Sequence, residues 1–537
     1  MKQNRTQQIT SYLFLTLLLF FAFYLGLDAY PLGDNNEGMY AEIAREMLET
    51  KQFIIPHLNY LPYLEKPPLL YWLMAGSMWL FGPTTFAARF IPATAALFTC
   101  LSLLFWARKC KRPQLGWLAA VILASSFGFV IISRIVFFDM LLTLWLTMSL
   151  LFFYLWFNSK IKSYLYASYA FLALAVLTKG VVALALAFPI AVAYLLWLRV
   201  DYKTVLSLFN PIGIALFLAL VIPWHILAQL QWQDFSRDYF INEQFMRFLD
   251  KRVPNDYYHG PIYYYLPRIG IYLLPWSVLV IGLLFFCRKT NLGVKYLYAK
   301  NWFAKQKWVA SFPSSISTWE RGTTNRQPIK PFLYLWFFIP LLFFSLSRAK
   351  ANYYMVVGLP PLALLFSLWI QQCFDKKIAT ESKAWARIKS ISVYCIASWI
   401  FPAMLVALWG LHKYQDDFSK RNFVNYFVKY HPNMPLYLYQ DYEKCSSLAF
   451  YLRRHLVMVD SKSKDLYYGE QTAAKPGWFI NMASFLQCTG PSYIVVMANR
   501  KEAFIAASKS KPFCEEITIG NASLFTNVCN GKIPRNI

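Results

Sequence analysis

The sequence predicts an all-α polytopic membrane protein that carries a small α/β domain at its C-terminal end. Of its 537 residues, 58% are hydrophobic and only 15% are charged, whereas soluble proteins carry about 25% charged residues. Apolar windows of about 20 residues recur along the chain, and this is the length that a helix needs to cross a bilayer. Basic residues gather in the short gaps between these windows, as is typical of the cytoplasmic loops of membrane proteins.

The first apolar window, 9–27, follows Lys2 and Arg5. It is too long for a signal-peptide core, and no small-residue cleavage site follows it, so we interpret it as an uncleaved signal anchor. Further spans are predicted at 86–106, 115–132, 140–157, 164–177, 181–198, 205–226, 264–287, 331–346, 354–370 and 391–411. We therefore expect about 11 transmembrane helices, and an odd number places the chain beyond the last span on the outer side.

The first outer loop, 28–85, is rich in carboxylates. Its apolar residues Met39, Tyr40, Ile43, Ala44 and Met47 would share one helical face, with Glu42, Arg45, Glu46 and Glu49 on the other. This pattern predicts an amphipathic helix that lies in the membrane interface. Pro67, with Pro68 behind it, suits the first turn of a second helix, 69–81, which is too short to cross the membrane.

The last segment, 412–537, differs from the rest in composition. Short apolar runs at 436–439, 456–459 and 493–497 alternate with helical stretches such as 500–508, which indicates a small α/β domain. We therefore expect a transmembrane domain over 1–411 and an outer α/β domain over 412–537.

The predicted topology accounts for the net charge of +26. The basic residues of 288–330 and 376–389 fall in predicted cytoplasmic loops, where such residues accumulate. Because the membrane explains the charge, we expect a lipid bilayer and no nucleic acid as a partner.

The cysteines divide between the two predicted domains. Of the nine, those in the last segment are Cys445, Cys488, Cys514 and Cys529, and the others lie in or beside spans. An even number in the soluble segment suggests an oxidising compartment. The sequence does not fix their pairing; a Cys514–Cys529 bridge would close a hairpin-like loop and contribute about 3 kcal/mol.

The unusual polar residues all fall on the outer side in this topology. They are Asp34, Glu37, His57, Glu65, Lys66, Arg134, Asp139, Lys179, Glu243, Arg247, Asp256, His259, Arg268, Arg348, Lys350, Tyr353 and Tyr354. Ionisable groups at membrane depth are costly, so they normally face a cavity or one another. A cavity of this kind beside lipid suits a lipid-phosphate substrate, because Lys and Arg bind phosphate and a carboxylate can activate or steer a nucleophile.

Several of these residues also have a purely structural interpretation. Asp34 or Asp139 could cap a helix, Lys66 could extend its ammonium to lipid headgroups, and His259 could be an ordinary loop histidine. Arg268 could anchor a helix at the interface. The clustering on one side is therefore a stronger indication of a site than any single residue.

Several motifs follow one another over roughly the first two-thirds of the chain. They read YAEIAREML, PHL and EKPPLLYW, then LTKG at 177–180, HGPIYYYLP at 259–267 and LLFFSLSRAKANYY at 341–354. In this order they resemble the bacterial polyprenyl-phosphate-sugar glycosyltransferases of the protein-mannosyltransferase type, and in particular the 4-amino-4-deoxy-L-arabinose lipid A transferases. The resemblance implies a glycosyltransferase C fold, in which a polyprenyl-phosphate sugar enters from the bilayer and transfer occurs at the periplasmic face.

The resemblance also implies roles for individual residues. Lys66, in the EKP motif, would engage the donor phosphate. Arg348, Lys350 and Tyr354 match a basic-aromatic loop that would help to bind it, and we add Arg268 as a candidate of the same kind. Glu65 and His259 could form part of a divalent metal site for Zn, Mg or Mn, but two ligands are too few to establish one. No cofactor is otherwise required.

One departure concerns the residues that steer the attack. The aminoarabinose enzymes read Asp-Glu-x-Arg-Tyr-Ala-Glu, whereas the matching segment of this chain, 36–42, starts with Asn36 in place of the aspartate. The nearest aspartate is Asp34, two residues upstream. We expect Asp34 or Glu37, together with Asp139, to steer the attack. The chain is also predicted to be about two spans shorter than those enzymes.

We therefore expect a multi-pass glycosyltransferase of the bacterial inner membrane with a periplasmic C-terminal domain. It would move one sugar, such as 4-amino-4-deoxy-L-arabinose, from undecaprenyl phosphate to lipid A or another envelope glycan. A protein acceptor, as for a protein O-mannosyltransferase, is the alternative. A flippase for lipid-linked glycans would need polar residues through both halves of the membrane, and an inactive scaffold would not need clustered ionisable groups. The sequence leaves the sugar, the acceptor and the oligomeric state open.

Overall fold

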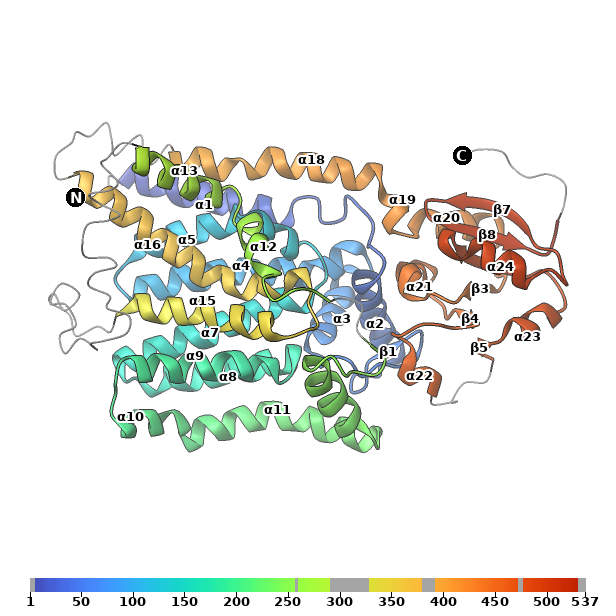
Figure 1. Ribbon diagram of the computed structural model, residues 1–537, viewed down its shortest axis with the longest axis horizontal. Coiled ribbons are helices and arrows are strands. Elements are labelled where there is room, and N and C mark those ends of the chain that lie inside the picture. Colours follow the sequence, from blue (N-terminus) through green and yellow to red (C-terminus); the bar gives the residue numbers. More distant parts are fainter. Residues whose placement is uncertain (1–4, 256–258, 290–327, 379–391, 472–476, 530–537) are drawn as a thin grey trace.

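The computed structural model describes residues 5–255, 259–289, 328–378, 392–471 and 477–529. A bundle of long helices makes up one end of the molecule and a small sheet domain the other (Figure 1). The predicted combination of a helical membrane-type domain with a small C-terminal sheet domain is thus confirmed. Most of the basic segment 288–330, part of 376–389, and Asp256 lie outside the described residues.

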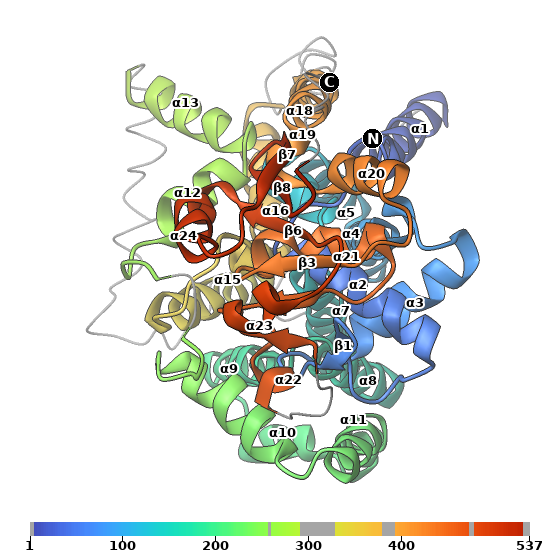
Figure 2. The same ribbon diagram turned by 90° about the vertical axis from the view of Figure 1, so that its right-hand side faces the viewer.

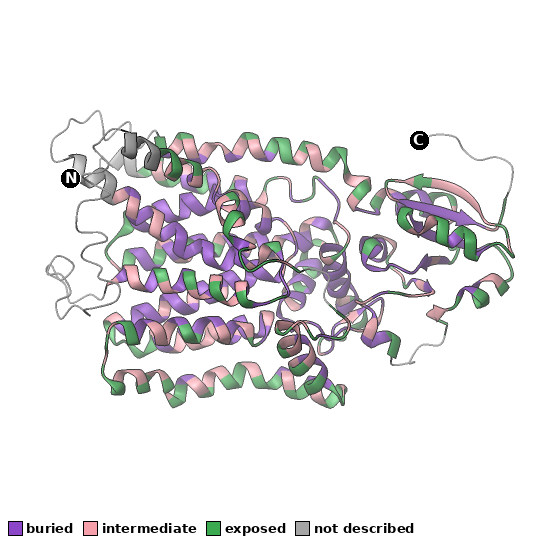
Figure 3. Ribbon diagram, in the orientation of Figure 1, coloured by how far each residue is buried: buried purple, intermediate pink, exposed green. Residues whose placement is uncertain are grey.

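The bundle is built from helices of very different burial. Its helices are α1 (Arg5–Tyr24), α4 (Thr85–Lys109), α5 (Pro113–Ala124), α6 (Phe127–Ser133), α7 (Phe138–Ser159), α8 (Lys162–Lys179), α9 (Val182–Trp197), α10 (Tyr202–Leu206), η1 (Ser207–Phe209), α11 (Pro211–Gln231), η2 (Ser236–Met246), α12 (Tyr265–Tyr272), α13 (Trp276–Lys289), α15 (Ile329–Leu346), η3 (Asn352–Gly358), α16 (Leu359–Ile378) and α18 (Ile400–Lys413). Helix α7 lies at the centre, whereas α11 and α18 lie outside and remain largely exposed (Figure 3). Exposed apolar helices of this kind are expected to face lipid.

Six of the described helical segments are long and apolar enough to cross a membrane, or eight if each of two bent pairs forms one span. The predicted spans 9–27, 164–177 and 181–198 coincide with α1, α8 and α9, which are helical but shorter or less apolar. The number of about 11 crossings therefore stays a prediction.

The bent pairs are α5 with α6, at 69°, and α12 with α13, at 100°. The first bend lies at Ser125, where Trp276 Nε1 donates to Ser125 Oγ at 3.0 Å and Trp399 Nε1 donates to its carbonyl at 2.8 Å. The second bend lies at Pro275, which has no N–H to continue a helical ladder. The hydrogen bonds show that the first break is held by neighbouring helices.

Two helices of the first outer loop lie between the bundle and the sheet domain (Figure 1). They are α2 (Asn36–Thr50) and α3 (Leu69–Phe81), and a short hairpin, β1 (His57–Leu58) with β2 (Leu61–Pro62), lies between them in the chain. Helix α3 has the predicted bounds: Pro68 stands at its start, and it stops at Gly82, whose φ of 74° favours glycine.

The amphipathic pattern of α2 correctly predicted a helix, but its charged face is covered by protein and not open to water or lipid headgroups. Its charged residues Glu42, Arg45 and Glu46 are buried together with its apolar ones. Helix α2 packs against α3 and against α21 (Ser446–Leu452) of the sheet domain. Arg45 donates to Glu42 at 2.7 Å and also pairs with Glu49, so the polar face carries its own counter-charges where the C-terminal domain covers it.

The C-terminal domain contains a six-stranded mixed sheet in the order β5-β4-β3-β6-β8-β7. Its elements are α19 (Gln415–Phe418), α20 (Arg421–Tyr430), β3 (Leu436–Tyr439), η4 (Glu443–Cys445), α21 (Ser446–Leu452), β4 (Val457–Val459), α22 (Tyr467–Gln471), β5 (Phe479–Ile480), α23 (Met482–Gln487), β6 (Tyr493–Met497), η5 (Ala498–Arg500), α24 (Lys501–Ala507), β7 (Cys514–Ile519) and β8 (Ala522–Thr526). The neighbours β5, β4, β3 and β6 are parallel, and β8 and β7 continue the sheet antiparallel. Viewed along the bundle, the domain covers its end (Figure 2).

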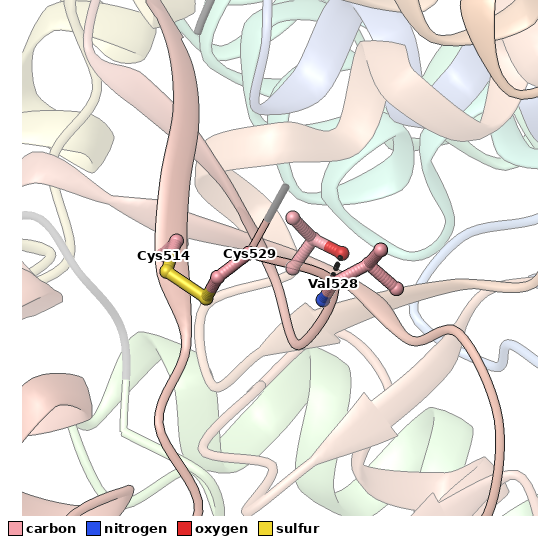
Figure 4. Close-up of a disulfide and its surroundings, with 4 residues drawn as sticks. Cys514, Val528 and Cys529 are labelled. Carbon is pink, nitrogen blue, oxygen red and sulfur yellow. Dashed lines mark hydrogen bonds between the residues drawn. A yellow bond between two sulfur atoms is a disulfide. The ribbon is translucent and has the colours of Figure 1, made fainter. Parts of the chain in front are cut away.

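A disulfide joins Cys514, at the start of β7, to Cys529, beyond the end of β8 (Figure 4). Of the pairings that the sequence left open, this one is formed, and it closes the β7–β8 hairpin. Cys445 and Cys488 are free, so the even count did not indicate a second bridge. Cys445 is buried beside Met497 Sδ and behaves as a small apolar residue.

Candidate active site

A cavity of about 400 Å³ lies between the helical bundle and the C-terminal domain. The bundle side, including the first outer loop, contributes Asn35, Asn36, Met39, Tyr40, Glu65, Lys66, Phe137, Phe138, Asp139, Lys179, Arg247, Arg252, Tyr353 and Tyr354. The C-terminal domain contributes Asp441, Glu443, Lys444, Lys462, Lys464, Asp465 and Arg500. Eight of these residues are Lys or Arg and five are Asp or Glu, so the cavity suits an anionic ligand.

Glu65 and Lys66 lie in the loop between β2 and α3 and project into this cavity. Glu65 pairs with Arg252 at 2.5 Å, with Lys66 at 3.7 Å and with Arg247 at 3.8 Å. Burial alone would raise the pKa of Glu65, but the charges of Arg252, Lys66 and Arg247 outweigh it and lower the pKa to about 2. Glu65 is therefore an ionised counter-charge for the surrounding cations.

Lys66 is a buried ammonium with two cations, Arg247 and Arg252, and two carboxylates, Glu65 and Glu243, close by. Burial, and then the positive charge of Arg247, lower the pKa of Lys66 to about 8, against the attraction of Glu65. Its ion-pair partner Glu65, at 3.7 Å, is shared with Arg247 and Arg252, so an anionic ligand would add a further counter-charge.

Asp139 and Lys179 form a further ion pair in the lining of the cavity. Asp139 lies in the first turn of α7 and Lys179 in the last turn of α8, with 2.5 Å between Lys179 Nζ and Asp139 Oδ1. Each charge also complements the dipole of its own helix end. The Lys179 ammonium lies 4.2 Å from the centre of the Tyr354 ring, which holds it in place by a cation–π contact.

A second cavity, of about 470 Å³, adjoins the first and shares with it Lys66, Lys179, Arg247 and Tyr354. The rest of its lining is mainly apolar: Val181, Val182, Ala185, Phe240, Ile241, Phe245, Phe248, Phe343 and Phe344, with Glu243, Gln244, Ser347 and Ala349. The cations thus lie where a polar cavity meets an apolar one. This arrangement suits an amphipathic ligand that carries its negative charge at the junction.

Asp34 lies outside the cavity, which corrects its expected role in steering the attack. Its carboxylate accepts from Lys420 Nζ at 2.7 Å, from Ser447 Oγ at 2.6 Å and from Ser447 N at 3.1 Å. Asp34 therefore fastens the first outer loop to the C-terminal domain. The contact is close, because a Cβ on Gly38 would lie 2.6 Å from the Ser447 nitrogen.

Glu37 does not line the cavity either. Both of its oxygens accept from Arg89, at 2.7 and 2.8 Å, and one also accepts from Gly33 N at 2.8 Å. The Glu37 carboxylate is therefore held in an ion pair with the buried Arg89. Asn36, in contrast, does line the cavity, and its side-chain oxygen accepts from Tyr40 at 3.0 Å. An amide thus stands where the resemblance implies an aspartate.

Of the residues expected to bind the donor phosphate, Lys66 and Tyr354 line the junction, but Arg348, Lys350 and Arg268 do not. Arg348 is exposed. Lys350 is buried and donates to the carbonyls of Phe344, Ser345 and Ser347, where it caps the end of α15.

Arg268 stacks on Tyr264, 3.4 Å from the ring centre, and donates to Asn352 Oδ1 at 2.8 Å. These contacts link α12 to the segment that follows α15. Arg268 and Lys350 are thus engaged in local structure, which the spacing of basic residues in the sequence could not reveal.

The expected metal ligands Glu65 and His259 do not form a metal site. No group of three His, Cys, Asp or Glu side chains suited to a metal occurs among the described residues. Glu65 is already surrounded by cations, and His259 Nδ1 lies 3.4 Å from Asp250 Oδ1 with its side chain half exposed. The residues present therefore do not fit a metal, and we derive no step through one.

Sequence reasoning missed several lining residues. Lys179 and Arg247 were recognised as outer residues without a role, and Arg252 was not singled out. Asp441, Lys462 and Arg500 follow the predicted strands 436–439, 456–459 and 493–497 within a few residues. The tendency of ligands to bind beyond the carboxyl ends of parallel strands could have identified them.

The chain is similar to known proteins over most of its length. Residues 13–237 match the family of dolichyl-phosphate-mannose-protein mannosyltransferases. The undecaprenyl phosphate-alpha-4-amino-4-deoxy-L-arabinose arabinosyl transferase of Yersinia enterocolitica is 31% identical over 373 residues, which is 67% of this chain and 59% of that enzyme. The enzyme of the same name from Aeromonas hydrophila is 32% identical over 364 residues, 65% of this chain and 58% of its own. The chain thus spans less than two-thirds of the length of these relatives.

A solved structure shows the same fold. ArnT from Cupriavidus metallidurans, crystallised with undecaprenyl phosphate, matches with a TM-score of 0.77 and 22% sequence identity. The match covers 98% of this chain and 99% of that one. The sheet domain and the helical bundle therefore both have counterparts in that structure.

Proposed function

We propose that this chain, whose residues 13–237 match the protein-mannosyltransferase family, is a membrane glycosyltransferase that moves one sugar from undecaprenyl phosphate to lipid A. The observation that carries the proposal is the junction of the two cavities. There, Lys66, Lys179 and Arg247 face an apolar cavity on one side and a polar one on the other. The named relatives support 4-amino-4-deoxy-L-arabinose as the sugar.

The donor fits the junction by its chemistry. Its prenyl chain would occupy the apolar cavity, its phosphate would lie beside Lys66 and Arg247, and its sugar would extend into the polar cavity. Transfer breaks the bond between the anomeric carbon and a phosphate oxygen, so negative charge grows on the departing undecaprenyl phosphate. Fixed cations at that point stabilise the transition state more than the ground state.

A phosphate acceptor agrees with the state of the carboxylates. A hydroxyl acceptor needs a general base, whereas a phosphate oxygen is already ionised at neutral pH and needs mainly positioning. In the cavity, Glu65 is paired with Arg252, Asp139 with Lys179, and Asp441 with Arg500. Each of these carboxylates is held by a cation, which weakens it as a general base and favours lipid A over a protein hydroxyl.

Asp465 tests this assignment, because its carboxyl lines the cavity and forms no ion pair with a described residue. We expect Asp465→Asn to retain transfer to within about threefold, since an ionised acceptor needs no base. Initial rates with lipid A as acceptor measure the effect. A fall of 100-fold or more, restored at high pH, would instead favour a hydroxyl acceptor.

The proposed location is the bacterial inner membrane, with the cavity and the C-terminal domain on the periplasmic side. The Cys514–Cys529 disulfide supports this, because such bonds persist in the oxidising periplasm and are rare in the cytosol. The ionisable residues of the cavity also gather at one end of the bundle, beside the C-terminal domain, which favours a one-sided enzyme over a transporter.

The pKa of Lys66 predicts the alkaline limit of the reaction. The pKa of about 8 means that the ammonium is present below pH 8 and is lost above it. We therefore expect kcat/KM for the donor to fall above about pH 8, by up to tenfold per pH unit. The acceptor phosphate is fully ionised in that range and cannot cause the fall. Lys66→Arg should move the fall to higher pH; an unchanged profile in that variant would exclude Lys66 as its source.

Transfer itself is tested with the full chain reconstituted in lipid. We expect labelled aminoarabinose to pass from undecaprenyl phosphate to lipid A and not to a peptide rich in Ser and Thr. If the label appeared on the peptide and not on lipid A, the acceptor would be a protein. If no undecaprenyl-phosphate sugar supported any transfer, the proposed function would be overturned.

A further inference from the structure

The C-terminal domain supplies one wall of the cavity through a single edge of its sheet. Asp441 follows β3, Lys462 follows β4 and Arg500 follows β6. Strand β3 lies between β4 and β6 in the sheet. The chain passes from β3 to β4 on one side, and β6 pairs with β3 on the other side, so the strand order reverses at β3. Such a point, beyond the carboxyl ends of parallel strands, is where open α/β sheets bind ligands.

This strand-end edge, formed by Asp441, Lys444, Lys462 and Arg500, carries an excess of positive charge. Asp441 accepts from Arg500 at 2.9 Å and from Lys444 at 3.0 Å, so two cations share one carboxylate. Lys462 is exposed, and its ammonium forms no ion pair with any residue that the structure describes. Its backbone N–H is held by the carbonyl of Gln440 at 3.1 Å, which fixes its position beside the edge.

The cavity therefore has cations on two walls, and Arg252 and Lys464 also belong to its lining. The bundle group, at Lys66, Lys179 and Arg247, adjoins the apolar cavity. The strand-end edge adjoins only the polar cavity, since none of its residues lines the apolar one. One lipid-linked phosphate can neutralise the first group. The second group is suited to another anion, one that carries no lipid chain beside the charge.

We propose that the strand-end edge binds the phosphate of the acceptor. This inference rests on the proposed function and assigns the acceptor half of the site to the C-terminal domain. The ligand class is a phosphate monoester on a lipid-anchored glycan. Lys462 and Arg500 would bind its oxygens by charge-assisted hydrogen bonds, and Lys444 would remain with Asp441.

The reaction balances with this placement. An ionised oxygen of the acceptor phosphate attacks the anomeric carbon, and the bond from that carbon to the donor phosphate oxygen breaks. The electron pair leaves with undecaprenyl phosphate beside Lys66, and no proton has to be moved. The two groups of cations thus bind the entering and the departing phosphate.

The test measures binding of two lipids separately by the full chain in nanodiscs. The lipids are undecaprenyl phosphate and lipid A, and the variants are Lys462→Glu and Arg500→Gln. Lys509→Glu is the matched control, because Lys509 is exposed on the same domain but does not line the cavity. We expect Lys462→Glu to weaken lipid A binding on the order of tenfold, as for one charge-assisted hydrogen bond, with undecaprenyl phosphate binding unchanged.

Two further arms identify the ligand. Lipid A without phosphates should bind as weakly to the wild type as intact lipid A binds to Lys462→Glu, and inorganic phosphate at millimolar concentration should compete only weakly. Equal binding of lipid A by wild type and Lys462→Glu, or by intact and dephosphorylated lipid, would overturn the inference. If both lipids bind as expected but no sugar is transferred, the proposed function fails and the binding site stands.

Discussion

Replacing Lys66 by alanine is expected to lower kcat/KM for the lipid-phosphate donor by about 100- to 1,000-fold, the usual effect of removing one preorganised group that stabilises developing negative charge. The Lys66 ammonium lies where the polar and apolar cavities meet, and it shares its partner Glu65 with Arg247 and Arg252. The fold should tolerate the change, because Glu65 keeps Arg252 at 2.5 Å as its partner.

Two variants separate this effect from a general loss of charge. Lys66→Arg keeps the cation and should retain most of the transfer, and Lys509→Ala removes an exposed lysine elsewhere and should change nothing. Steady-state kinetics with saturating acceptor provide the measurement. Full transfer by Lys66→Ala would show that Lys66 does not bind the donor phosphate.

Replacing Asp34 by alanine is expected to destabilise the protein by about 3–5 kcal/mol, because it leaves the buried ammonium of Lys420 without its partner. The C-terminal domain should also become easier to detach from the bundle, since the same carboxylate binds Ser447. Thermal unfolding in detergent and limited proteolysis near residue 415 measure the two effects. Asp28→Ala, an exposed acid of the same loop, is the control.

A double variant distinguishes this structural role from a catalytic one. Replacing both partners of a buried ion pair by apolar residues is often close to neutral for stability, so Asp34→Ala combined with Lys420→Met should recover stability and transfer together. Recovery of stability without transfer would show that the Asp34 carboxylate takes part in the reaction.

Local features predicted much of the fold. Pro67 and Pro68 at one end and Gly82 at the other fix the bounds of α3, because proline suits the first turn of a helix and glycine its end. The apolar runs 436–439 and 493–497 are the strands β3 and β6 as observed. These elements were predictable because the residues that determine them are neighbours in the chain.

Long-range contacts limited the prediction of the site. Asp34 is engaged by Lys420 and Ser447, which are hundreds of residues away in the chain. The periodicity of α2 could not reveal that the C-terminal domain covers its charged face. The sequence likewise could not show that Lys350 donates its hydrogen bonds to the carbonyls at the end of α15. Lys66, Asp139 and Tyr354 reach the cavity because each lies at or beside the end of a helix that faces it.

The most direct test is a cryo-electron microscopy structure of the full chain with undecaprenyl phosphate. We predict that the phosphate lies within about 3 Å of Lys66 Nζ and that the prenyl chain occupies the apolar cavity beside Phe240 and Phe343. A phosphate bound beside Arg348 and Arg268, with the junction empty, would contradict the account.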